Sequence, residues 1–176
     1  MGLRNYLIEG VSGAGKTTVA TELQRRGYHV LHGDRELAYR GNPQTGEPLD
    51  DAVWQQGAED PAFVHAHHLW DVGKVKAILN DRNQPISFFC GGSRNFEQFI
   101  DQFDGVFVLD IDLETLKRRL AERPQDEFGS RPAERDLILR LHATREDIPH
   151  NAISIDATRP LASVVDTLLC HCVTSS

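Results

Sequence analysis

The sequence predicts an α/β fold with a five-stranded parallel sheet and helices on both of its faces. Five short apolar runs are almost continuously hydrophobic instead of alternating, which is typical of strands that are buried on both sides. Amphipathic segments separate these runs, and such strand-helix alternation favours a parallel sheet with right-handed crossovers. The length of 176 residues predicts that all of this forms one domain.

The elements follow one another regularly along the chain. Strands are expected at residues 5–10, 29–34, 85–90, 105–111 and 151–157. Helices are expected at residues 16–26, about 60–81, 94–102, 113–122, 133–147 and 160–172. Two stretches interrupt this pattern, residues 35–58 and 123–135, which are polar and broken by proline and glycine. Long irregular segments of a compact domain are usually functional or disordered, so we expect both to border a site.

Composition excludes several classes of protein. Hydrophobic residues make up 40% of the chain and its formal net charge is -7, which is unlike the basic surface that binds a nucleic-acid polymer. No apolar run approaches the roughly 18 residues of a membrane span, and Glu9 interrupts the N-terminal apolar run, so we expect neither membrane insertion nor a secretory signal. Three cysteines without framework spacing fit reduced thiols. We therefore expect a cytoplasmic monomer or homodimer.

The strongest motif is Gly10-Val-Ser-Gly-Ala-Gly-Lys-Thr17, a full match to the phosphate-binding P-loop pattern G-x-x-x-x-G-K-[ST]. A predicted strand precedes it and a predicted helix follows, as a P-loop requires. The glycines let several backbone N–H groups converge on one anion, and the positive end of the helix adds to this. Lys16 is expected to reach the β- and γ-phosphates of ATP, and the Thr17 hydroxyl to bind Mg²⁺. The predicted nucleotide-binding residues here are Ser12, Gly13, Ala14, Gly15, Lys16, Thr17 and Thr18.

A P-loop indicates a nucleotide and leaves the reaction open. The guanine-reading motif Asn-Lys-x-Asp of GTPases is absent from the sequence. A motor or AAA-type ATPase usually has a larger body and a strand that ends in adjacent acidic residues. Here Asp110 and Asp112 end the fourth strand, but a helix and an arginine-rich segment follow directly.

Four further segments stand in a recognisable order: His32-Gly-Asp34, Cys90-Gly-Gly-Ser93, an arginine-rich stretch that ends in Arg131-Pro132, and residues 155–161. Over nearly the whole chain this order loosely resembles the small P-loop kinases, especially the shikimate and gluconate kinase group and the wider nucleoside and nucleotide kinase superfamily. The resemblance implies the three-layer P-loop NTPase fold, strand order 2-3-1-4-5, and a lid that closes over ATP. It also implies phosphate transfer to a small hydroxylated acceptor.

The acceptor is expected at the carboxyl ends of the second and third strands, where open α/β sheets bind ligands. Asp34 can take the proton of the acceptor hydroxyl; the alternative is a turn residue. Shikimate kinases have Asp-x-Asp here, so His32 replaces the carboxylate that helps to hold Mg²⁺. Cys90-Gly-Gly-Ser93 looks like their Gly-Gly-Gly substrate loop, although Ser93 also suits a helix N-cap. The predicted acceptor-binding residues are Asp34, Arg35, Gly91, Gly92, Ser93, Arg94 and Arg131.

Residues 123–135 are predicted to form the lid, and residues 35–81 the acceptor-binding region. Arg119 and Arg123 lie four residues apart and so project from one helix face. Arginine stabilises the charge on a transferring phosphoryl group. The predicted catalytic residues are therefore Lys16, Asp34 and Arg123, and Arg119 is assigned to the nucleotide. Related kinases pack the loop after the last strand around adenine, which assigns Thr158, Arg159 and Pro160 to the nucleotide; a plain strand-to-helix turn is the alternative.

The segment Val64-His-Ala-His-His-Leu-Trp-Asp71 is expected to be helical, with His65 and His68 on one face. The first interpretation is surface or core histidines; the second is stacking on the acceptor together with Trp54 or Trp70. The sequence therefore predicts an ATP- and Mg²⁺-dependent phosphotransferase for a small molecule. A nucleoside is favoured, and a sugar acid or shikimate-like polyol is the alternative. A regulatory ATPase without an acceptor pocket is the rival from another class.

Overall fold

The computed structural model describes residues 3–174. Its parallel strands are β1 (Arg4–Glu9), β2 (His29–His32), β5 (Ile86–Cys90), β6 (Gly105–Asp110) and β7 (Ile153–Asp156). They lie side by side in the order β2-β5-β1-β6-β7. Counted along the chain, this is the second, third, first, fourth and fifth parallel strand. The expected α/β fold and strand order are confirmed.

The sheet is covered on both faces, as the continuous hydrophobicity of its strands requires. In the central strand β1, Tyr6 and Ile8 belong to one buried cluster while Leu7 belongs to the other, and none of the three is more than 1% exposed. Because side chains alternate across a strand, this division shows that both faces of β1 are packed.

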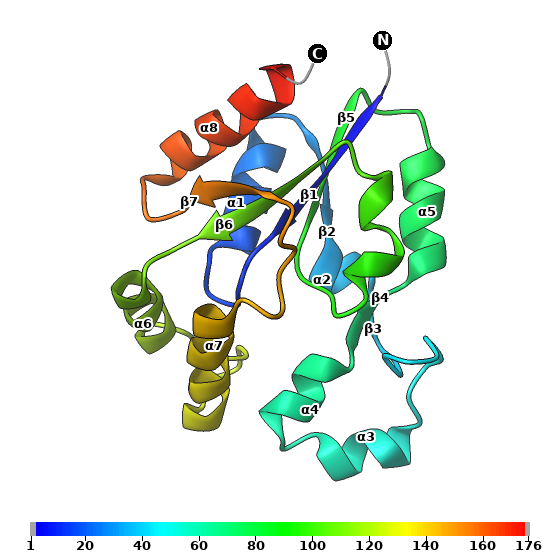
Figure 1. Cartoon of the computed structure of the whole chain (residues 1–176), viewed down its shortest axis with the longest axis vertical. Coiled ribbons are helices and arrows are strands. Elements are labelled where there is room, and N and C mark those ends of the chain that lie inside the picture. The colour runs from blue at the N-terminus through cyan, green and yellow to red at the C-terminus, as the bar shows by residue number, and fades with distance from the viewer. Residues whose placement is uncertain (1–2, 175–176) are drawn as a thin grey trace.

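The two outer layers are made of different elements (Figure 1). On one face lie α1 (Lys16–Arg25) and α8 (Leu161–Thr174), whose apolar residues share a core cluster with α6 (Leu113–Ala121) and α7 (Pro132–Thr144). On the other face lie α5 (Val72–Asn80) and the 3₁₀ turns η1 (Phe96–Gln98) and η2 (Ile100–Gln102). Among residues 3–174, no helix combines the length and the apolar character that crossing a bilayer would need.

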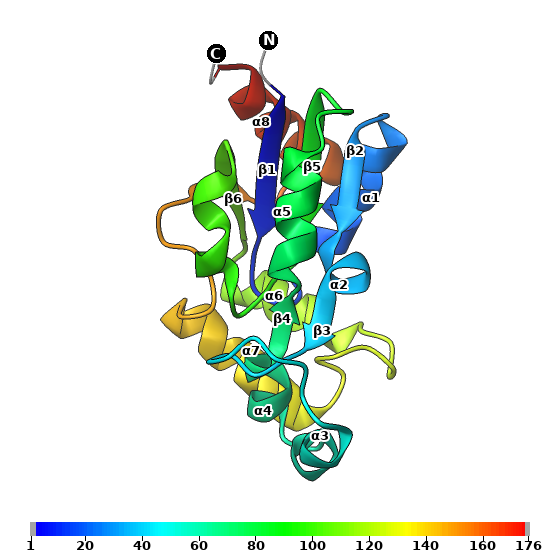
Figure 2. The ribbon, with the colours of Figure 1, turned by 90° about the vertical axis from the view of Figure 1, so that its right-hand side faces the viewer.

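The chain between β2 and α5 forms a projection beyond the carboxyl edge of the sheet, opposite the end where β1 begins and α8 ends (Figure 2). It contains α2 (Gly33–Glu36), β3 (Ala38–Arg40), α3 (Asp51–Gly57), α4 (Pro61–Ala66) and β4 (His68–Trp70). β3 and β4 pair antiparallel as a small second sheet. The parallel sheet thus carries on its carboxyl edge a projection that can border a ligand site.

The single helix expected at 60–81 is wrong, because α4 ends before His67 and a new helix begins after Asp71. Between them Trp70 is fully buried, and its backbone N–H and C=O both pair with the Asn95 side chain. The Asp71 carboxylate accepts the Lys74 N–H and so starts α5 afresh. Tertiary contacts to Asn95 therefore turn this apolar stretch into a strand.

Two smaller expectations also need correction. The helix expected at 94–102 consists of the two 3₁₀ turns, and within it Phe99 is buried with its ring stacked on Trp70 at a centroid distance of 5.9 Å. The second strand ends at His32 instead of residue 34, and the Glu36 carboxylate accepts the His32 N–H at 2.7 Å. The chain turns at Gly33, where a Cβ would lie only 2.0 Å from a Trp70 ring atom. This turn places Asp34 over the edge of the sheet.

Candidate active site

The P-loop connects β1 to α1 at the carboxyl edge of the sheet. Gly13 and Gly15 have φ angles of 93° and 101°, in the left-handed region that favours glycine. The Lys16 ammonium donates to the carbonyl oxygens of Gly10 at 2.5 Å and Val11 at 3.1 Å, so the lysine lies along its own loop. Burial lowers its pKa, while the negative charges of Asp34 and Glu9 act in the opposite direction.

Two arginines reach the P-loop. Arg119 lies on α6, whereas Arg123 lies beyond the end of α6 at Ala121, so the helix face that the two were expected to share is wrong. Arg119 donates to the carbonyl oxygens of Ala14 at 3.0 Å and Ala157 at 2.8 Å, so it joins the P-loop to the loop after β7. Arg123 donates to the Ser12 hydroxyl at 3.1 Å and to the carbonyl oxygen of Phe128. Burial lowers the pKa of both guanidinium groups, and arginine nonetheless stays protonated in proteins.

A large open cleft of about 1000 Å³ lies over these groups. Its lining includes P-loop residues 12–18, Asp34, Arg35, Arg119, Arg123, Phe128, Ala157 and Arg159. Thr158 and Pro160 are not among the described residues that line it. The Thr158 N–H instead donates to the Asp156 carboxylate at 3.0 Å, which closes a local turn. The loop after β7 thus borders the cleft through Ala157 and Arg159.

Asp34 holds the junction between three segments. Its Oδ1 accepts hydrogen bonds from His68 Nε2 at 3.1 Å and from the Gly92 N–H at 3.3 Å. Burial raises the pKa of Asp34, but the hydrogen bond from His68 and the charge of Lys16 outweigh this and hold the pKa below its ordinary value. Asp34 is therefore a charged hydrogen-bond acceptor at neutral pH, half exposed to the cleft.

The glycine loop after β5 comes close to Asp34, as predicted. A Cβ at Gly91 would lie 2.8 Å from both Asp34 Oδ1 and a Trp70 ring atom, so only glycine fits without displacement. Ser93 is buried, and its N–H faces the Glu9 carboxylate at 3.4 Å, while the residues that follow form no α-helix for it to cap. The Arg94 guanidinium donates to the Asp147 carbonyl oxygen at 2.8 Å.

A second cavity of about 310 Å³ adjoins the cleft. It is lined by Gly10, Ser12, Lys16, Asp34, Val64, His65, His68, Gly92, Arg94, Phe128 and Asp147. Four residues, Ser12, Lys16, Asp34 and Phe128, line both spaces. The structure therefore has two adjoining compartments, with the P-loop lysine and the Asp34 carboxylate at their common wall.

A family model described as an AAA domain matches residues 7–140, which is more than half of the chain. The chain belongs to the AAA-domain family. Its small body and the order of its motifs favour a small kinase over an AAA-type ATPase. The Asp110 carboxylate accepts hydrogen bonds from Arg145 at 2.6 Å and Ser154 at 2.5 Å.

Comparison with individual proteins finds small kinases. A guanylate kinase from Nitrosospira multiformis is 26% identical over 160 residues, covering 82% of this chain and 72% of its own. A gluconokinase from Sinorhizobium meliloti 1021 shares the fold with a TM-score of 0.53 at 18% identity, covering 95% of this chain and 90% of its own. A deoxyadenosine kinase from M. mycoides with bound dATP has a TM-score of 0.51 at 14% identity, covering 95% of this chain and 98% of its own. The expected resemblance to small P-loop kinases is confirmed at the level of the fold.

Some predicted residues of the AAA-domain chain lie away from these compartments. Arg131 lies at the start of α7 and forms an exposed ion pair with Glu59 at 3.3 Å, outside both linings. Trp70 is fully buried and stacks on Phe99, so the interpretation of Trp70 as an acceptor-stacking residue is wrong. Trp54 instead packs against the Arg40 guanidinium at 4.0 Å from its ring centroid.

Sequence reasoning did not assign Glu9 or Asp147 to the site, and it left His65 open between a surface or core histidine and a ring that stacks on the acceptor. Glu9, the last residue of β1, is 1% exposed; burial raises its pKa to about 7, against the lowering effect of Arg94 and Lys16. Asp147 follows α7 and is 7% exposed. His65 faces the cavity, and burial lowers its pKa to about 3. The position of Glu9, an acidic residue inside the apolar β1 run, could have indicated its role. Nothing near Asp147 in the sequence indicates that it lines a cavity.

Proposed function

We propose that the chain is an ATP-dependent phosphotransferase that moves the γ-phosphate to a hydroxyl of a small molecule. The observation that carries this proposal is the pair of adjoining compartments with Lys16 and Asp34 at their common wall. A nucleotide with its phosphates on the P-loop occupies the cleft, and the acceptor occupies the smaller cavity. A regulatory ATPase would not need the second cavity.

The proposed transfer assigns a role to each charged group. The acceptor oxygen forms a bond to the γ-phosphorus as the bond between that phosphorus and the bridging oxygen of ADP breaks. The hydroxyl proton passes to the Asp34 carboxylate, and the products are ADP and the phosphorylated acceptor. Lys16 and Arg123 stabilise the negative charge on the moving group, while Arg119 fixes the P-loop against the loop after β7.

Thr17 and Asp34 both line the cleft and offer the oxygen donors that Mg²⁺ prefers beside nucleotide phosphates. Bound there, Mg²⁺ would neutralise phosphate charge. His32 stands where shikimate kinases have a further carboxylate, and its ring contacts Gln24 at 3.2 Å. We assign the metal to Thr17 and the proton of the acceptor hydroxyl to Asp34.

A nucleoside is the acceptor we propose first. The smaller cavity continues into a groove that shares Asp34, Val64 and His68 with it and adds the rings of Tyr39, Trp54 and His67. Ring-lined walls suit a planar base better than a sugar acid. The deoxyadenosine kinase and the guanylate kinase found by comparison act, by their names, on nucleosides and nucleotides, which supports this choice.

The test is a screen of nucleosides, sugars and polyols for ATP-dependent product formation, with Lys16→Ala as the variant. Wild-type protein is expected to release ADP much faster with one class of acceptor, and Lys16→Ala is expected to abolish transfer because the phosphates lose their cation. Lys117→Ala, which removes an exposed lysine of α6, is the matched control. ADP release that no acceptor stimulates, or a folded Lys16→Ala protein with normal transfer, would contradict the proposal.

A further inference from the structure

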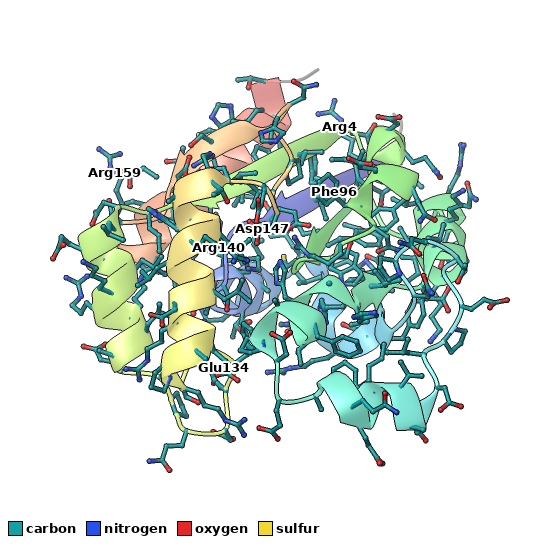
Figure 3. All side chains as sticks on the ribbon, turned by 60° about the horizontal axis from the view of Figure 1, so that its bottom comes forward. Arg4, Phe96, Glu134, Arg140, Asp147 and Arg159 are labelled. Carbon is teal, nitrogen blue, oxygen red and sulfur yellow. The ribbon has the colours of Figure 1, made fainter. Side chains whose placement is uncertain are left out.

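The inner end of the smaller cavity holds a carboxylate without a hydrogen bond. Asp147 is 7% exposed, and its Oδ1 has no partner among the residues that the structure describes. Its Oδ2 lies 3.7 Å from Arg94 Nη1 and 3.7 Å from His65 Nε2, which is beyond hydrogen-bond distance. Figure 3 shows Asp147 in the middle of the molecule, beside α7. The carboxylate is thus ion-paired with Arg94 through Oδ2, while its buried Oδ1 lacks a hydrogen bond. A buried acceptor without a hydrogen bond is costly, so Oδ1 is expected to serve a ligand.

The positive charges of this cavity are already engaged. Within residues 3–174, the lysines and arginines that line it are Lys16 and Arg94. Lys16 lies against the P-loop carbonyls and belongs to the nucleotide phosphates in the proposed function. Arg94 has a side chain only 14% exposed and donates to the Asp147 backbone. An acceptor phosphate or carboxylate would draw Arg94 away and leave the Asp147 charge buried without compensation.

The neighbouring histidine does not change this balance. The pKa of His65 is lowered to about 3, with burial as the largest cause and the positive charge of Arg94 as the next. His65 is therefore neutral at physiological pH and adds no cation to the cavity. The charged groups that line the cavity are therefore the carboxylates of Asp34 and Asp147, the Arg94 guanidinium, which is engaged by Asp147, and Lys16, which is engaged by the P-loop.

We propose that Asp147 is a specificity-determining residue, and that the acceptor presents to it an uncharged or positively charged hydrogen-bond donor, a hydroxyl or an amine. An acceptor with a phosphate or carboxylate at that position is rejected. This inference rests on the proposed function and narrows it: nucleosides, polyols and amino sugars fit, whereas nucleoside monophosphates and sugar acids do not. The chain would then differ in acceptor class from the guanylate kinase and the gluconokinase that it resembles.

The experiment compares neutral and amino acceptors with related acceptors that carry a phosphate or a carboxylate. Adenosine is paired with adenosine monophosphate, guanosine with guanosine monophosphate, and glucosamine and glucose with gluconate. Phosphoryl transfer is followed by ADP release with ATP and Mg²⁺, and binding by thermal shift with a non-hydrolysable ATP analogue. In each set the anionic member is expected to have a kcat/KM at least about tenfold lower, because an unpaired buried charge costs that much or more.

Asp147→Asn tests whether Asp147 selects acceptors by charge, because the variant keeps the size of the side chain and removes its charge. The variant is expected to raise the KM of the best neutral or amino acceptor about 10- to 100-fold with kcat nearly unchanged, and to reduce the discrimination against anions. Asp136→Asn, an exposed position on α7, is the matched control. Anionic acceptors that react as well as their neutral partners would overturn the inference while the proposed function stands. If no acceptor is phosphorylated, the proposed function fails. The thermal-shift measurements then still decide whether the cavity prefers neutral or amino ligands to anionic ones. If Asp147→Asn does not fold, the wild-type pairs decide the question by themselves.

Discussion

Replacing Asp34 by asparagine removes one negative charge and one proton acceptor while keeping the size of the side chain. The structure shows why the change should alter the chemistry of the side chain and leave its position unchanged. Asp34 Oδ1 accepts from His68 Nε2 and from the Gly92 N–H, and an asparagine Oδ1 can accept both hydrogen bonds. The side chain should therefore stay over the edge of the sheet. What it loses is the ability to take the proton of the acceptor hydroxyl.

The expected effect is a loss of about 10²- to 10⁴-fold in kcat, the usual range for a general base, or about 3–5 kcal/mol of transition-state stabilisation. The affinity for ATP should hardly change, because Lys16 is fixed by the carbonyl oxygens of Gly10 and Val11 and not by Asp34. The pKa of Asp34 lies below its ordinary value of 3.8, so the group stays ionised at and above that pH. The wild-type pH profile should show no acidic limb from Asp34 within the neutral range.

The assay measures steady-state kcat and KM for the best acceptor of the screen, and ATP-analogue affinity by calorimetry, for wild type, Asp34→Asn and the exposed control Asp101→Asn. A Mg²⁺ titration separates two roles. Partial rescue by raised Mg²⁺ would indicate that Asp34 supports the metal, and no rescue that it serves the acceptor. Near-normal turnover and acceptor affinity in Asp34→Asn would refute the reasoning, because the acceptor would then not bind at the end of β2.

Three further predictions follow from individual contacts. Arg123→Ala should lower kcat about 10²- to 10³-fold with a much smaller change in the KM for ATP, since Arg123 serves the moving charge. Arg118→Ala, at an exposed position on the preceding helix α6, is the control, and an effect on ATP affinity alone would contradict this role. Glu9→Gln should change the pH dependence of stability. The pKa of Glu9 is raised from 4.5 to about 7, so the wild-type protein loses up to about 3 kcal/mol of unfolding free energy as the pH rises through that window. The variant should not show this loss when urea unfolding is measured at several pH values. A stability difference that is the same at every pH would argue against this. Gly91→Ala should lower the free energy of unfolding by about 1–3 kcal/mol, because its Cβ would meet Asp34 and Trp70 at 2.8 Å. Gly27→Ala, also at a positive φ (91° against 151° for Gly91) but with nothing within 4 Å, is the control for backbone strain, and equal losses would rule out the steric cause.

Local signals in the chain were sufficient for the parallel sheet and the P-loop. The apolar runs at β1, β5 and β6 are buried on both faces whatever their exact partners, so continuous hydrophobicity identified them. Glycine at positions 13 and 15 is required by the positive φ of the backbone itself. Arg119 lies on α6 and Arg123 lies beyond the end of that helix at Ala121, so the shared helix face expected from their spacing is wrong, although both side chains reach the P-loop.

Only the tertiary structure decided the acceptor side of the molecule. The stretch around Trp70 has a helical pattern in sequence, but Asn95, 25 residues away, binds its backbone and makes it a strand. Asp147 comes next to Arg94 and His65 only when the loop after α7 returns over the sheet edge. A helix or strand is set largely by neighbours along the chain, whereas a pocket is formed by side chains from distant segments. The sequence by itself therefore determined how this protein holds phosphate, and the packing of distant segments determined what lies beside it.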